Sequence, residues 1–148
     1  MILDQITPAL IGALTGVIAA YATSYLKFRQ EISSGTLERR FEAYLKIWKQ
    51  TGLLPEWPRS EEVTYQDLKQ LSEGFRDWYF EGGGMLLSHN SRKKYGDLQK
   101  IATKAYQNAE NEKDHLRDAD YEQVRASCST LRSALTEDLL SRRQTTLL

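Results

Sequence analysis

The sequence predicts an all-α protein in which one N-terminal transmembrane helix continues into a cytoplasmic up-down antiparallel helical bundle. Residues 6–26 carry no charged side chain, and at about 1.5 Å of rise per residue a helix of this length crosses a hydrocarbon core of ~30 Å. Beyond this stretch, apolar residues recur at helical spacing, and no run alternates as a strand does. We therefore divide the chain into an anchor (1–26), a helical bundle (27–143) and a frayed tail (144–148).

The charges around the uncharged stretch predict its orientation. Asp4 precedes it, whereas Lys27 and Arg29 follow it directly. Because basic residues stay on the cytoplasmic side of a membrane, we expect an inner-membrane protein with its N-terminus outside and its C-terminal domain in the cytoplasm. A cleaved signal peptide is one alternative, since residues 20–22 (Ala-Tyr-Ala) resemble a cleavage site, but the basic region at the start of such a peptide is missing. A buried helix of a soluble assembly is another, which we disfavour because no charged residue interrupts the stretch.

The anchor carries a pattern of small residues. Gly12, Gly16 and Ala20 recur every four residues and so lie on one helical face. Such a face lets two membrane helices approach closely, and we therefore expect a homo-oligomer that associates through the anchor in the lipid bilayer. The alternative is that glycine and alanine are simply frequent in membrane helices.

Four amphipathic segments are expected after the anchor. The first contains Leu37, Phe41, Tyr44, Leu45 and Trp48 at helical spacing and ends near Gly52. The second begins at an N-cap, Thr64, with Asp67 at the position of a capping box. The third begins after residues 88–91, and residues 108–120 form the next connection. The fourth has a heptad-like seam of apolar residues, namely Tyr121, Val124, Cys128, Leu131 and Leu135.

The most unusual local sequence is Asp77-Trp78-Tyr79-Phe80-Glu81-Gly82-Gly83-Gly84-Met85-Leu86-Leu87-Ser88. This segment resembles one found in uncharacterised bacterial proteins that have an N-terminal membrane anchor and a small helical domain. The resemblance implies the same fold and no assigned activity. Physically, three successive glycines permit a tight reversal between two helices.

Two functional interpretations of this turn remain beside the structural one. Met85, Leu86 and Leu87 could enter the membrane interface, with Arg92, Lys93 and Lys94 meeting anionic headgroups. Alternatively, the backbone N–H groups at the start of the third helix could bind an anion next to the same basic residues, together with Gly82, Gly83 and Gly84. We favour membrane contact, because the predicted topology turns this segment towards the bilayer.

Composition and motifs exclude several functions. The 20 basic residues balance 20 acidic ones, whereas binding of nucleic acid as a main activity requires a net basic surface. His89 and His115 lack the spacing of metal ligands. We find no catalytic or metal-binding motif and expect no cofactor. An enzyme that uses Asp77, Glu81 and Arg92 is a distant alternative.

Trp57 lies between two prolines in the loop farthest from the membrane. We favour packing of its indole over the end of the bundle, with contact to a protein partner as the alternative. The sequence as a whole predicts a membrane-anchored binding or scaffold protein, which recruits a cytosolic protein partner, rather than an enzyme. A second hypothesis is an oligomeric effector that permeabilises membranes in a bacterial defence system.

Overall fold

The computed structural model describes the backbone of residues 3–140 and the side chains of residues 16, 19–27 and 35–140. These residues form helices joined by turns and loops, with no strand, as the sequence predicts; one isolated bridge joins Thr64 and His115. The chain divides into two compact units, Met1–Arg39 and Arg40–Leu148. Helix α1 (Leu3–Gln50) has residues in both.

The N-terminal unit contains the stretch that the sequence assigns to the membrane. Among the residues that the structure describes, no helix combines the length and the apolar character that crossing a membrane requires. The side chains of residues 1–15, 17 and 18, which make up most of the predicted anchor, lie outside those described. The transmembrane helix is therefore a prediction from the sequence.

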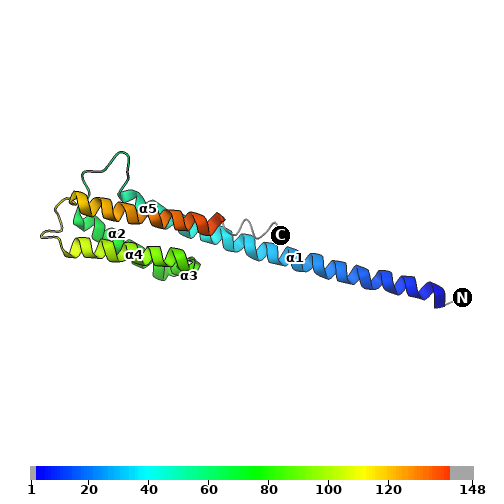
Figure 1. Ribbon diagram of the computed structural model, residues 1–148. Helices are drawn as coiled ribbons and strands as arrows, with labels where there is room; N and C mark the ends of the chain where they lie inside the picture. The colour runs from blue at the N-terminus through cyan, green and yellow to red at the C-terminus, as the bar shows by residue number, and fades with distance from the viewer. Residues whose placement is uncertain (1–2, 141–148) are drawn as a thin grey trace. The chain divides into compact units, whose positions relative to one another are not determined.

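The second unit is a helical bundle. It contains the last turns of α1, the short η1 (Thr51–Leu53), α2 (Tyr65–Trp78), α4 (His89–Gln107) and α5 (Asp118–Leu140). Between α2 and α4 the chain reverses through η2 (Tyr79–Gly83) and α3 (Gly84–Leu86). Successive long helices run in opposite directions, and α4 packs against both α2 and α5 (Figure 1). Within this unit the predicted up-down order is confirmed.

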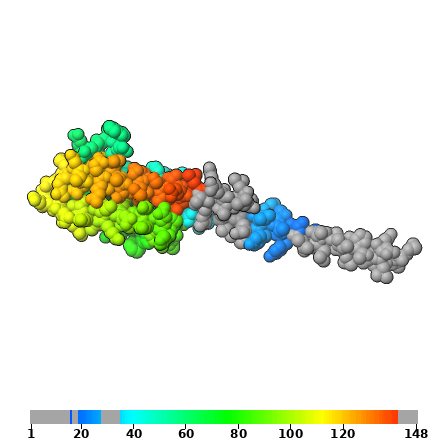
Figure 2. All heavy atoms as spheres, in the orientation of Figure 1, coloured from blue at the N-terminus to red at the C-terminus, as the bar shows by residue number. Residues whose placement is uncertain are grey.

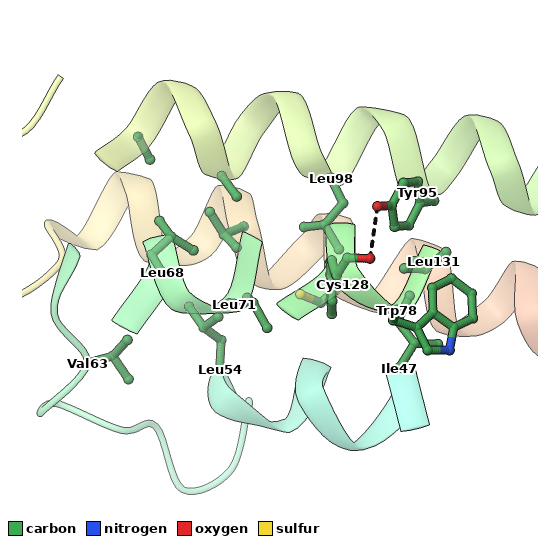
Figure 3. Close-up of a cluster of buried hydrophobic side chains, with 14 of the residues drawn as sticks. Ile47, Leu54, Val63, Leu68, Leu71, Trp78, Tyr95, Leu98, Cys128 and Leu131 are labelled. Atoms are coloured by element: carbon green, nitrogen blue, oxygen red, sulfur yellow. Dashed lines mark hydrogen bonds between the residues drawn. The ribbon is translucent and has the colours of Figure 1, made fainter. Parts of the chain in front are cut away.

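Each helix of the bundle contributes to a single core. Figure 3 shows Ile47 of α1, Leu68 of α2, Leu98 of α4 and Leu131 of α5 at successive levels of the space between the helices, and each is 0% exposed. Burial of each such side chain stabilises the fold by roughly 1.5–3 kcal/mol. All five residues of the predicted seam in the last helix are at most 2% exposed, namely Tyr121, Val124, Cys128, Leu131 and Leu135.

The helix starts agree with the sequence. The hydroxyl of Thr64 accepts a hydrogen bond from the Asp67 backbone N–H at 3.3 Å, and Oδ2 of Asp67 accepts one from the Thr64 N–H at 2.9 Å. This reciprocal pair is the predicted capping box of α2. At the start of α4, the Ser88 hydroxyl accepts a hydrogen bond from the Ser91 N–H at 3.1 Å. The two caps fix where the chain turns back on itself.

Candidate interaction sites

The glycine turn is built for close packing. Of the three glycines in the turn, only Gly82 has a positive φ, of 114°. At Gly83 a Cβ would lie 2.3 Å from Cε2 of Trp78, and at Gly84 it would lie 2.6 Å from Cε2 of Tyr79. Real Cβ atoms do not approach an aromatic ring so closely. One glycine is therefore required for backbone conformation and two for contact with aromatic rings, which favours the structural interpretation of the turn.

The exposure of the apolar side chains in the turn contradicts part of the predicted lipid contact. Of the three apolar residues in the turn, only Met85 projects outward, at 83% exposed. Leu86 packs partly against the core, and Leu87 is 6% exposed within it. The prediction is thus wrong for Leu87, because this residue closes the core where the chain enters α4. Phe80, at 80% exposed, is the apolar residue that the sequence interpretation missed.

The basic residues after the turn differ in their surroundings. Nη2 of Arg92 donates to the Gly84 carbonyl at 3.1 Å and so fastens the turn to α4. Lys93 is exposed and Lys94 half-buried, and Lys94 lines a polar groove together with Asp97. The three cations do not share one partner among the described residues. Binding of an anion or headgroup by them stays a prediction.

A buried carboxylate links three parts of the bundle. Oδ2 of Asp138 in α5 lies 2.9 Å from the Tyr44 hydroxyl of α1 and 3.2 Å from the Ser88 backbone N–H. The same hydroxyl lies 2.8 Å from the Leu86 carbonyl. Burial raises the pKa of Asp138, but hydrogen bonds from Ser88 and Tyr44 more than offset this effect, so its pKa lies below the ordinary value. Asp138 therefore holds α1, the turn and α5 together as an anion.

Sequence reasoning missed Asp138, although a signal was present. The seam of the last helix advances in alternating steps of three and four residues, and the next step after Leu135 reaches position 138. A carboxylate at a core position of such a seam indicates a buried polar contact, because an unpaired buried charge is very costly. The side chain is 8% exposed, as this pattern requires.

Trp57 does not cap the bundle. Its indole is 87% exposed, so the favoured prediction of an inward-facing ring is wrong. The reason lies in its neighbours: the Tyr121 hydroxyl donates to the Pro55 carbonyl at 2.8 Å, and Leu54 is 0% exposed. Leu54 and Tyr121 occupy the place at the end of the core that Trp57 was expected to fill. Figure 2 shows the loop between α1 and α2 standing out from the bundle in teal.

The residues on both sides of Trp57 are tied to α5. Glu56 forms an ion pair with Arg125, at 3.2 Å between Oε2 and Nη1. On the other side, Arg59 pairs with Asp118, and its guanidinium carbon lies 4.5 Å from the centre of the Tyr121 ring. The loop is thus held at both ends while the indole between them meets solvent.

A second apolar surface lies along α1 and α5. The helical spacing of the apolar residues in the first bundle helix predicts one apolar face, but in the structure only some of these residues are buried. Tyr44 and Ile47 face the core, whereas Phe41, Leu45 and Trp48 are 55%, 40% and 44% exposed. With α5 they border an open groove of about 260 Å³. The α5 side of this groove is formed by Leu135, Thr136 and Leu139.

The small residues of the anchor are only partly described. Gly12 lies outside the described side chains. Gly16 and Ala20 are exposed, and a Cβ at Gly16 would meet no atom of the chain within 4 Å. A face open in this way can receive another helix, and association through it stays a prediction.

The candidate catalytic residues do not form a site in the described part of the chain. Asp77 pairs with its neighbour Arg76 at 3.4 Å on the surface, Glu81 is exposed, and Arg92 is used by the turn. Among the described residues, no group of three or more His, Cys, Asp or Glu side chains could hold a metal ion. Burial raises the pKa of the Cys128 thiol to about 12, which keeps it protonated.

Comparison with known families, curated proteins and solved structures finds no match to this chain. The resemblance suggested by residues 77–88 therefore stays a prediction. The functional argument depends on the two exposed surfaces, at Trp57 and along the groove.

Proposed function

We propose that the protein is a single-pass membrane-anchored scaffold whose bundle recruits a cytosolic protein partner through Trp57. The observation that carries this proposal is a tryptophan 87% exposed to solvent in a loop held on both sides. Tryptophan is enriched among the residues that dominate binding energy at protein interfaces. A loop that is already ordered also loses less conformational entropy on binding than a mobile one.

The charges of the loop indicate the chemistry of the partner. Residues 54–64 contain three carboxylates, Glu56, Glu61 and Glu62, against one cation, Arg59. Glu61 and Glu62 are exposed and lie close to Trp57 in sequence. Complementary potentials steer association and suppress wrong partners. The partner that fits this surface is a protein with an apolar pocket for the indole and basic side chains around it.

The membrane tether in this proposal is supported by the sequence. The uncharged stretch 6–26 is long enough to cross a bilayer, and Lys27 and Arg29 follow it. This arrangement places the bundle in the cytoplasm and the N-terminus outside. The exposed Gly16 and Ala20 are available for association of two such helices in the membrane.

The tether is tested by fractionation of cells that express the whole chain. We expect the protein in the membrane pellet after a carbonate wash, and a version that lacks residues 1–26 in the supernatant. Recovery of the intact chain in the supernatant would refute the tether. A protein that starts at Thr23 would instead identify a cleaved signal peptide.

The partner site is tested by crosslinking in intact cells followed by mass spectrometry. Trp57→Ala should remove a crosslinked protein that both the wild type and Phe80→Ala retain. Phe80 is the matched control, because it is a similarly exposed aromatic residue at the opposite end of the bundle. Equal crosslinking by all three would refute a role for Trp57. Dye leakage from cells that is abolished by Gly16→Leu would instead support the permeabilising effector.

A further inference from the structure

We propose that the groove between α1 and α5 is closed by a second copy of this chain, with the two α1 segments packed antiparallel across Leu45. The proposal concerns residues 41–49 of α1 and the adjoining end of α5, all within the bundle. It does not involve residues of the Trp57 loop or of the predicted membrane anchor.

The apolar character of the surface is the first argument. Phe41, Leu45 and Trp48 form a ridge one helical face wide, and each is at least 40% exposed. The groove beside this ridge is lined mainly by apolar side chains of α1 and α5. The surface therefore contains both a projecting part and a hollow. A two-fold pairing at Leu45 brings the ridges of the two copies together and covers the groove beside each, so that the same surface is buried on both copies, as a self-complementary contact requires.

The spacing of the ridge residues fits an antiparallel pair. Phe41 lies four residues before Leu45, and Trp48 lies three residues after it. When Leu45 meets Leu45 of the other copy on a two-fold axis, Phe41 of each copy lies beside Trp48 of the other. The two large rings then cover the leucines from both sides and shield them from water.

Charge complementarity selects this direction. Glu42 and Lys49 are seven residues apart and so flank the ridge on the same side of α1. Both are exposed, and neither takes part in an ion pair among the described residues. Antiparallel pairing sets Glu42 of each copy opposite Lys49 of the other. Parallel pairing, about a two-fold axis along the helices, would instead put this flank of the two copies on opposite sides of the contact, so that Glu42 would not meet Lys49 of the other copy.

The direction of pairing separates this contact from association through the anchor. In the antiparallel pair, Arg40 of one copy and Arg40 of the other lie at opposite ends of the contact between the two α1 segments. Two helices that associate side by side in one bilayer, through Gly16 and Ala20, would instead enter the bundles from the same side. The orientation of the groove contact can therefore be measured independently.

Disulfide crosslinking of the whole chain purified in detergent tests the orientation. Leu45→Cys should give a covalent dimer on mild oxidation, whereas Phe41→Cys alone should not. A mixture of Phe41→Cys and Trp48→Cys chains should crosslink to each other. The native Cys128 is 0% exposed and does not compete. Absence of the Leu45→Cys dimer, or self-crosslinking of Phe41→Cys, would overturn the proposal.

A charge swap tests the recognition. Glu42→Lys or Lys49→Glu alone replaces two attractive contacts by two repulsive ones, and we expect about a tenfold weaker dimer in sedimentation experiments. The double variant restores both pairs and should return to the wild-type affinity. A double variant as weak as the single ones would contradict the antiparallel register.

Two further variants separate this contact from the other surfaces. Gly16→Leu and Trp57→Ala should leave the Leu45→Cys crosslink unchanged, because neither residue touches the groove. Loss of the crosslink in Gly16→Leu would assign the association to the N-terminal unit and overturn a groove dimer. The same loss in Trp57→Ala would assign it to the loop.

Discussion

Replacement of Gly83 by alanine tests whether the turn depends on contact between backbone and ring. Gly83 has φ −58° and ψ −37°, values that alanine adopts freely. Conformation alone therefore predicts that Gly83→Ala stabilises a helical position by up to ~1 kcal/mol. The new Cβ would, however, lie 2.3 Å from the ring of Trp78. That ring is buried, and its Nε1 donates to the Ala43 carbonyl at 2.9 Å.

The expected loss of stability combines two costs of displacing the Trp78 ring. Overpacking of a core costs roughly 1–3 kcal/mol, and displacement of Trp78 endangers a hydrogen bond that contributes about 1 kcal/mol. We expect Gly83→Ala to lower the free energy of unfolding by about 2–3 kcal/mol, which corresponds to roughly 10 °C in Tm.

Gly96→Ala is the matched control for this measurement. Gly96 lies in α4, and a Cβ there meets no atom within 4 Å. This change should therefore stabilise the bundle by up to ~1 kcal/mol. Thermal unfolding followed by circular dichroism measures both variants in the whole chain. Equal stabilisation by the two substitutions would refute the packing of the turn against Trp78.

Three other predictions concern the core and the loop. Tyr44→Phe should lower the free energy of unfolding by about 1–2 kcal/mol at pH 7. Because folding lowers the pKa of Asp138, this difference from the wild type is present above the unfolded pKa of about 3.9 and should shrink as the pH falls through the folded pKa. Denaturant unfolding at pH 7 and pH 3 will measure the change. The Cys128 thiol, with a pKa of about 12, should react with a thiol reagent only under denaturing conditions. Trp57→Ala should change stability by less than ~0.5 kcal/mol, since its indole makes no core contact.

The helices were predictable because local and periodic signals agree. Thr64 and Asp67 form their cap from residues three apart, and the seam from Tyr121 to Leu135 is buried throughout. Both signals depend on short-range geometry that a sequence displays directly. The absence of strand periodicity likewise predicted the all-helical bundle.

The exposed surfaces were harder to predict because periodicity does not say which neighbour covers an apolar residue. Phe41 and Tyr44 belong to one helical stripe, yet α5 reaches only the second of them closely enough to bury it. Trp57 is exposed because Leu54 and Tyr121 fill the end of the core. Such outcomes depend on contacts between segments about 65 to 95 residues apart, as in the Pro55–Tyr121 and Tyr44–Asp138 hydrogen bonds.

Helix α5 connects the two proposed surfaces and also keeps them separate. Tyr121, near its start, holds the Trp57 loop, whereas Asp138, near its end, holds Tyr44 at the groove. At about 1.5 Å per residue these two positions lie roughly 26 Å apart along the helix. Changes so far apart, with no shared partner, add in free energy. A partner at Trp57 and a second copy at Leu45 should therefore bind the same bundle independently, so each protomer of such a dimer can carry one partner.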